Sequence, residues 1–173
     1  MKKFILFLTT LFIVAVSSSF FVCAEEDYSN YFGVIRDKDG NVVETIPFPT
    51  GRVTYVETPY TLPPGGTFTS YQYKPSIAFQ IGFAYSTRDG SVTTTRDLMV
   101  KLEIFNASSI GGTRYLVKSA SYSTNREYNY DDTTGTVLLG AYPVSSSRPY
   151  YNGVVTNPTS QSMTIVIVVT SDL

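Results

Sequence analysis

The stretch Ser76–Ser86, SIAFQIGFAYS, predicts a central β-strand and with it the class of fold. Side chains of a strand alternate between its two faces. Large apolar or aromatic side chains occupy one face of this stretch, while small residues and one glutamine occupy the other. The large side chains are Ile77, Phe79, Ile81, Phe83 and Tyr85. We expect this face to pack against a hydrophobic core.

The same two-residue rhythm runs through most of the chain that follows residue 30. Between Asp97 and Phe105, apolar residues alternate with Lys101 and Glu103, as in a half-solvated antiparallel strand. Further runs of this kind cover residues 30–36, 41–46, 52–57, 67–73, 113–122, 135–142, 150–156 and 161–171. After the first 24 residues, no window of about 11 residues shows the apolar spacing of a helix. The sequence therefore predicts an all-β fold, a single antiparallel β-sandwich of jelly-roll or Ig-like type with about nine or ten strands, and a closed barrel is the alternative.

Turn signals separate these runs. Asp37–Gly40 ends in an Asp-Gly pair between two strand-like segments, a strong hairpin signal because glycine accepts a positive φ. Arg88–Gly90 predicts a second such turn, followed by a polar edge strand or arm at 91–95. Residues 58–66, TPYTLPPGG, are expected to form a loop, because proline lacks the N–H that a strand ladder needs.

The first 24 residues have the three-part layout of a secretory signal peptide, of a kind typical of bacteria. Lys2 and Lys3 give a positive start, an apolar run covers Phe4–Val16, and small residues precede Ala24. The apolar run is shorter than the ~20 residues of a bilayer span. We therefore expect cleavage after Ala24 and a secreted or cell-surface product. An uncleaved anchor and lipidation of Cys23 are the alternatives.

Residues 25–173 have the length of one domain. A domain of this size buries about 70% of its unfolded surface, which is enough for a core without cross-links. Cys23 is the only cysteine, so the mature chain cannot form an internal disulfide. Cleavage leaves 11 basic against 14 acidic residues and no basic cluster, which argues against nucleic-acid binding. The mature chain has no apolar stretch long enough for a helical membrane span.

Residue types restrict the chemistry available to the mature chain. It has no histidine and no cysteine, which removes the Ser-His-Asp and Cys-His nucleophile systems and the usual zinc, copper and iron ligand sets. Carboxylates remain, and a glycosidase needs two of them at a suitable separation, but their spacing picks out no pair. The sequence therefore predicts that the protein is not an enzyme.

Two acidic segments are candidates for calcium binding. Asp37–Asn41 is rich in oxygen ligands, but its glycine stands at the fourth position where a calcium loop has it at the sixth, and a hairpin turn explains the segment better. Asp131 and Asp132 form the second candidate, for which a solvated loop is the simpler interpretation. No other cofactor is expected.

Tyrosine is enriched, with 14 residues, all after the signal peptide. Exposed tyrosines supply rigid, amphipathic contact area for a ligand. The candidate ligand-binding residues are Tyr128 and Tyr130 in a polar loop and Tyr150 and Tyr151 at the start of a strand. The alternative is that tyrosine is simply a good strand former in cross-strand pairs.

These observations favour a non-catalytic extracellular or cell-surface binding module whose partner is a glycan or a protein. A carbohydrate-active accessory domain or carboxylate-based glycosidase is the first alternative. A self-assembling matrix or fibre subunit is the second, because polar edge strands can pair between copies.

Overall fold

A computed structural model describes residues 31–48, 55–86, 99–123 and 134–171. It contains ten strands and, within these ranges, no helix. The strands are β1 (Tyr31–Arg36), β2 (Val42–Pro47), β3 (Tyr55–Leu62), β4 (Thr67–Ser70), β5 (Phe79–Ser86), β6 (Met99–Ala107), β7 (Tyr115–Ser123), β8 (Thr134–Ala141), β9 (Tyr150–Thr156) and β10 (Met163–Ser171). The predicted signal peptide, the second Asp-Gly turn and the strand at 91–95 lie outside the described residues.

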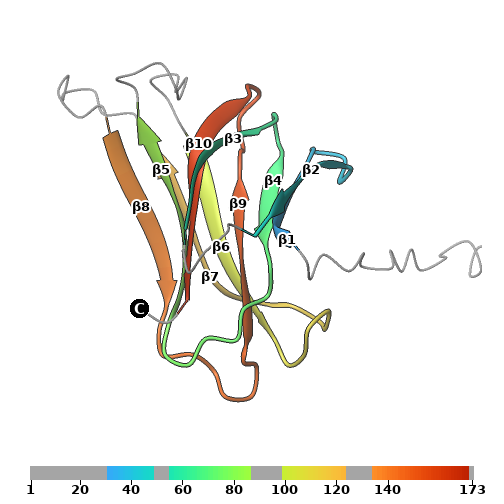
Figure 1. Cartoon of the computed structure of the whole chain (residues 1–173), viewed down its shortest axis with the longest axis vertical. Coiled ribbons are helices and arrows are strands. Elements are labelled where there is room, and N and C mark those ends of the chain that lie inside the picture. Colours follow the sequence, from blue (N-terminus) through green and yellow to red (C-terminus); the bar gives the residue numbers. More distant parts are fainter. Residues whose placement is uncertain (1–30, 49–54, 87–98, 124–133, 172–173) are drawn as a thin grey trace, which may run out of the picture.

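The strands form two antiparallel sheets that face each other (Figure 1). The six-stranded sheet has the order β2-β1-β4-β9-β6-β7, and the four-stranded sheet has the order β3-β10-β5-β8. Two separate sheets confirm the predicted antiparallel β-sandwich. The described part of the chain contains no helix long and apolar enough to cross a membrane.

The chain changes sheet between consecutive strands everywhere except at β1–β2 and β6–β7. Sequence neighbours therefore seldom pair with each other. In particular, β9 and β10 lie in different sheets, so residues 157–162 form a corner between the sheets.

Strand β5 supplies the centre of the core, as predicted. Phe79, Ile81 and Phe83 are fully buried between the sheets. Ile77 is 54% exposed, which corrects its place on the predicted apolar face. Strand pairing begins only at Phe79, opposite Ala141 and Ser171, so Ile77 lies before the sheet.

Strand β10 runs through the middle of the four-stranded sheet between β3 and β5. Its inner face is buried and consists of Met163, Ile165, Ile167 and Val169. Val166 and Val168, on the other face, are half-buried. The apolar run of this strand therefore reflects its central position in the sheet.

Strand β3 corrects the prediction of a loop at residues 58–66. Its last residues, through Leu62, pair with β10, and Pro59 lies within the strand opposite Val166. Among the described strands β10 is the only hydrogen-bonded neighbour of β3, so β3 is an edge strand. An edge strand tolerates proline because its outward side needs no N–H donor.

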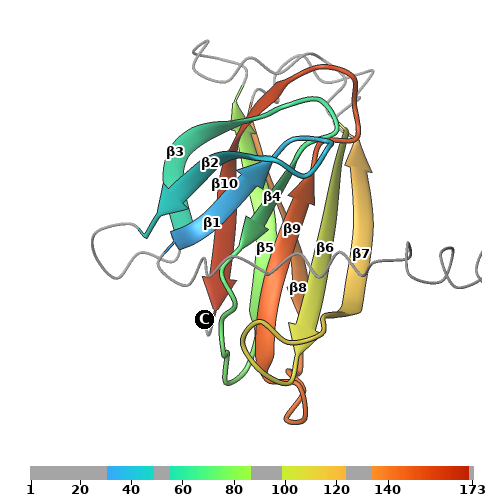
Figure 2. The same cartoon turned by 90° about the vertical axis from the view of Figure 1, so that its right-hand side faces the viewer.

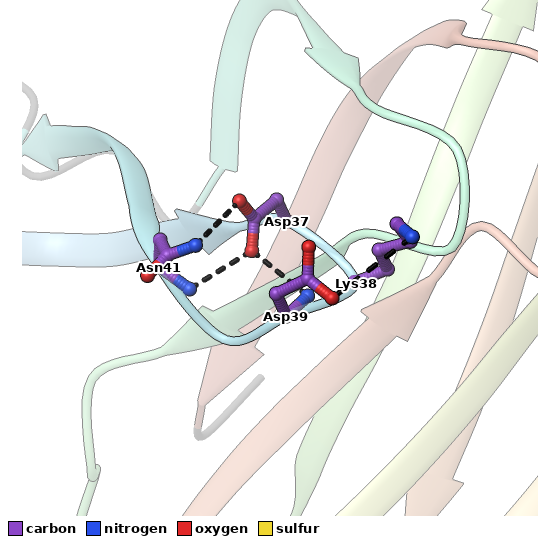
Figure 3. A network of polar contacts seen from close by, with 4 residues as sticks. All are labelled: Asp37, Lys38, Asp39 and Asn41. Atoms are coloured by element: carbon purple, nitrogen blue, oxygen red, sulfur yellow. Dashed lines mark hydrogen bonds and ion pairs between the residues drawn. The ribbon is translucent and has the colours of Figure 1, made fainter.

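The hairpin predicted at Asp37–Gly40 joins β1 to β2 (Figure 3). Gly40 has a φ of +86°, the left-handed conformation that favours glycine. One carboxylate oxygen of Asp37 accepts hydrogen bonds from the backbone N–H groups of Asp39 and Asn41, both at 2.9 Å. The other oxygen accepts a third bond, also 2.9 Å, from the Asn41 side chain. The Asp37 side chain is thus bonded within the turn, as the hairpin interpretation requires.

Candidate ligand-binding site at one end of the sandwich

Three loops that are far apart in sequence meet at one end of the sandwich, at the bottom of Figures 1 and 2. They are residues 71–78 between β4 and β5, residues 108–114 between β6 and β7, and residues 142–149 between β8 and β9. We call this surface, together with the strand residues that border it, the loop end. Sandwich domains commonly bind ligands through loops gathered in this way.

The strand register lines up four residues along the border of the loop end. Tyr115 on β7 pairs with Asn106 on β6, and Asn106 pairs in turn with Tyr151 on β9. Tyr151 forms an isolated bridge with Tyr73, with both backbone N···O distances at 2.7 Å. A row of three tyrosines and one asparagine therefore crosses three strands and reaches the 71–78 loop.

Three cations of the loop end each lie over an aromatic ring. The guanidinium carbon of Arg148 is 3.9 Å from the centre of the Tyr115 ring. The Lys74 ammonium lies 5.9 Å from the Tyr150 ring, and the Arg114 guanidinium carbon lies 5.6 Å from the Phe105 ring. Attraction between a cation and a ring face restrains both partners and leaves the positive charge uncompensated.

The three loops contain no acidic residue. The acidic side chains that the structure describes lie elsewhere, on β2, on the β1–β2 hairpin and on β6. The last of these, Glu103, pairs with Lys101 at 2.8 Å. Among the described residues, the loop end is therefore a local concentration of positive charge on a protein whose net charge is −1.

A chain of aromatic contacts runs from the border of the loop end into the core. Phe48 contacts Tyr71 with ring centroids 5.5 Å apart, and Tyr71 contacts Tyr73 at 5.6 Å. Phe79 then connects Tyr73 and Tyr151, at 5.9 and 6.0 Å. The pKa of the Tyr73 phenol is raised because the side chain is largely buried, with neighbouring Tyr71 as the second cause. Phe48 is exposed and Tyr151 is 1% exposed, so the chain of rings fixes the 71–73 segment to the core.

The structure separates the two tyrosines predicted at the start of β9. Tyr150 is half-buried and contacts Lys74, so its ring borders the loop end. Tyr151 is buried, and its hydroxyl oxygen accepts a 2.7 Å hydrogen bond from the backbone N–H of Ser145. Tyr151 thus holds the 142–149 loop in place. The prediction that it is exposed for ligand binding is corrected, because its side chain is buried.

The remaining predicted site residues, Tyr128, Tyr130, Asp131 and Asp132, lie outside the described residues. Within the described ranges, no group of three or more acidic, histidine or cysteine side chains could hold a metal ion.

Sequence reasoning missed the most accessible aromatic residue of the loop end. Tyr142 is 75% exposed at the start of the 142–149 loop. It also missed Tyr115, Arg148 and Lys74, because no motif in the sequence connects these residues with one another. The available signal was the lack of acidic residues in all three loops, but only the topology shows that these loops share one end of the molecule.

No family model matches this chain, and neither does any curated protein. Solved structures similar to it include PirA, with 10% identity and a TM-score of 0.42 over 70% of this chain and 99% of that chain. The enzymatically active domain of bacteriophage CBA120 tailspike protein 4 is similar at 14% identity and a TM-score of 0.41, over 84% of this chain. This chain spans 20% of that tailspike chain. TmCBM61, solved in complex with β-1,4-galactotriose, is similar at 6% identity and a TM-score of 0.35, over 68% of this chain and 67% of that chain. At such identities each likeness concerns the fold alone.

Proposed function

We propose that this protein is a non-catalytic extracellular module whose loop end binds carbohydrate. The observation that carries the proposal is the gathering of accessible aromatic rings and cationic hydrogen-bond donors at the loop end, on the three loops and on the strand residues that border them. Tyr142 is the most exposed of these rings, Tyr115 is exposed under Arg148, and Tyr150 is half-buried beside Lys74.

Aromatic side chains offer a flat apolar face and, in tyrosine, a polar hydroxyl, a combination that suits the mixed surface of a sugar ring. The Arg148 and Lys74 side chains add donors beside the rings. Because Tyr151 and Phe79 anchor the neighbouring segments in the core, little ordering is needed when a ligand binds.

Two of the carboxylates that the structure describes support a role without catalysis. Asp37 is bonded within its own turn, and Glu103 pairs with Lys101. Neither borders the loop end, and a glycosidase would need two carboxyl groups about 5 to 9 Å apart across the bound sugar.

A polysaccharide binding screen on residues 25–173, followed by titration calorimetry of any sugar bound, tests the proposal. Replacing Tyr142 or Tyr115 by alanine should weaken binding by about fivefold, since a stacked aromatic contact contributes about 1 kcal/mol. Val43→Ala is the control, because Val43 is exposed on β2. Equal affinity of all variants, or no binding to any saccharide, would contradict the proposal.

Self-association through β7 is a second candidate function. Among the described strands β7 pairs only with β6, runs for nine residues, and exposes Leu116 and Val117. An unpaired edge of this kind can add a strand from another copy. The counter-argument is Lys118, which carries a charge on this edge and donates a 3.0 Å hydrogen bond to the Gly140 carbonyl of β8.

Light scattering distinguishes the two functions. If β7 mediates assembly, the protein forms oligomers that Val117→Lys dissociates while the unfolding midpoint is unchanged. A monomer at all accessible concentrations would remove this candidate.

A further inference from the structure

We infer that the saccharide bound at the loop end is acidic and that Arg148 and Lys74 recognise its anionic groups. This inference rests on the proposed carbohydrate-binding function. It concerns the chemical class of the ligand, which the fold and its aromatic rings leave open.

The first argument is that Arg148 and Lys74 have no carboxylate partner among the described residues. Elsewhere in the described chain Lys101 lies 2.8 Å from a carboxylate oxygen of Glu103, and Lys38 lies 4.0 Å from one of Asp39. Arg148 and Lys74 have no ion pair with any described acid. Their described partners are the aromatic rings of Tyr115 and Tyr150, which hold the cations without neutralising them.

The second argument is geometric. Tyr115 and Tyr151 lie on the two strands that flank β6. Neighbouring strands are ~4.8 Å apart, so these two positions lie roughly 10 Å from each other. Tyr150 adjoins Tyr151 but points to the opposite face of the sheet, so the rings that hold Arg148 and Lys74 stand at two separated points of the border, on opposite faces of the six-stranded sheet. Such spacing suits an extended chain with repeated charges better than a single small anion.

The third argument is the preorganisation of Arg148. Its guanidinium carbon lies 3.9 Å from the centre of the Tyr115 ring, so the side chain is restrained before any ligand arrives. A guanidinium group presents planar pairs of N–H donors that match a carboxylate or sulfate group. Stacking on a ring leaves the N–H donors at the edge of the guanidinium group free to make such a contact.

Charge also argues for a glycan over a nucleic acid. The protein has a net charge of −1 and a sequence pI near 5.4, and the described loop end holds only three cations. Nucleic-acid binding usually draws on a broad basic surface. A saccharide whose charges are spaced apart needs fewer cationic contacts than a nucleic acid does.

The experiment uses residues 25–173 and three probes: polygalacturonate, its fully methyl-esterified form, and a single-stranded oligonucleotide of mixed sequence. The esterified form keeps the sugar rings and removes their charge. We expect binding to polygalacturonate that weakens as salt rises from 50 to about 500 mM, because added ions screen exposed charges. Binding to the ester should be about tenfold weaker or undetectable.

Substitutions of Arg148 and Lys74 test whether these side chains contact the acidic groups of the saccharide. Arg148→Gln and Lys74→Gln should each weaken polygalacturonate binding by about tenfold, the value of one charge-assisted hydrogen bond. Arg148→Lys keeps the charge but loses the planar fork, and should recover only part of the affinity. Lys38→Gln is the control, because Lys38 is an exposed cation on the β1–β2 hairpin. Unchanged thermal midpoints confirm that each variant folds.

The outcomes separate the inference from the proposed function. Equal binding of the acidic and esterified probes, or equal loss in the Lys38 control, overturns the inference and leaves a neutral-sugar module. Tighter binding of the oligonucleotide also overturns it. Failure to bind any saccharide, in this experiment and in the polysaccharide screen, overturns the proposed function itself.

Discussion

The side-chain amide of Asn157 donates a 3.2 Å hydrogen bond to the carbonyl oxygen of Leu62, which joins the β9–β10 corner to the end of β3. The same nitrogen lies 2.9 Å from the Pro63 carbonyl oxygen and 2.7 Å from the Gln161 carbonyl oxygen. The amide oxygen accepts two bonds from Thr159, one from its backbone N–H and one from its hydroxyl. One fully buried side chain thus satisfies the backbone where the chain crosses between the sheets.

Asn157→Ala is therefore expected to destabilise the protein by about 3 kcal/mol, because it leaves buried carbonyl groups without a donor. Urea unfolding measures the change in the free energy of unfolding. The control is Asn152→Ala, because Asn152 is as buried as Asn157 but its side-chain oxygen has no hydrogen-bond partner. The control should change stability by no more than about 1 kcal/mol, and similar losses in both variants would contradict the role of the Asn157 bonds.

Gly153 on β9 packs so closely against Ile81 on β5, in the other sheet, that a Cβ atom has no room there. A Cβ atom at Gly153 would lie 2.5 Å from the Cβ of Ile81, which cannot move without its strand. Gly153→Ala should therefore destabilise the protein by about 1 to 3 kcal/mol through overpacking. Gly140→Ala is the control, since its Cβ would meet only Gln80 at 3.5 Å, an ordinary contact. Thermal unfolding compares the two variants, and equal midpoints would show that β9 can shift to make room.

The Asp37 carboxyl should titrate below its ordinary pKa. The hydrogen bond from the Asn41 side chain is the largest cause, and the carboxylate also accepts bonds from nearby backbone N–H groups. A lowered pKa means that this group contributes stability above its unfolded pKa and that the contribution disappears as pH falls through the lower, folded pKa. Asn41→Ala should raise the pKa toward its ordinary value, as measured by NMR titration of the carboxyl carbon, while Val43→Ala should leave it unchanged. An Asp37 pKa that is insensitive to Asn41→Ala would contradict the bond seen in Figure 3.

Ionisation of the Tyr73 phenol should lower the stability of the folded protein in alkaline solution. Burial raises the pKa of its phenol above the ordinary value of about 10, so the unfolded chain loses the proton first. The stability it contributes is fully present below about pH 10 and is lost as pH rises toward the folded pKa. Tyr73→Phe should therefore flatten the decline of the thermal midpoint above pH 10, and Tyr142→Phe, at an exposed position, serves as the control. The same decline in Tyr73→Phe and the parent protein would contradict this assignment.

Much of the fold could be predicted because β-strand patterns are local. The alternation in β5, β6 and β10 distinguishes core-facing from outward residues, and these strands form where expected. The Asp37–Gly40 turn forms because glycine at its last position accepts a positive φ. In each case the deciding interactions lie within a few residues of one another.

The errors arise where distant segments decide the outcome. Residues 58–62 are a strand because β10 pairs with them, and Pro59 is tolerated because no described strand lies on the other side. Tyr150 and Tyr151 are adjacent and chemically identical, yet only Tyr151 turns into the core, where Phe79 and Ser145 contact it.

By itself, then, the sequence determined that the chain forms an antiparallel sandwich, since strand periodicity and turn chemistry are properties of short segments. Only the tertiary structure decided which loops share an end. Residues 71–78, 108–114 and 142–149 come together because consecutive strands usually change sheet, and this order of strands depends on pairings between segments far apart in the chain. The candidate site exists only once those long-range pairings have formed.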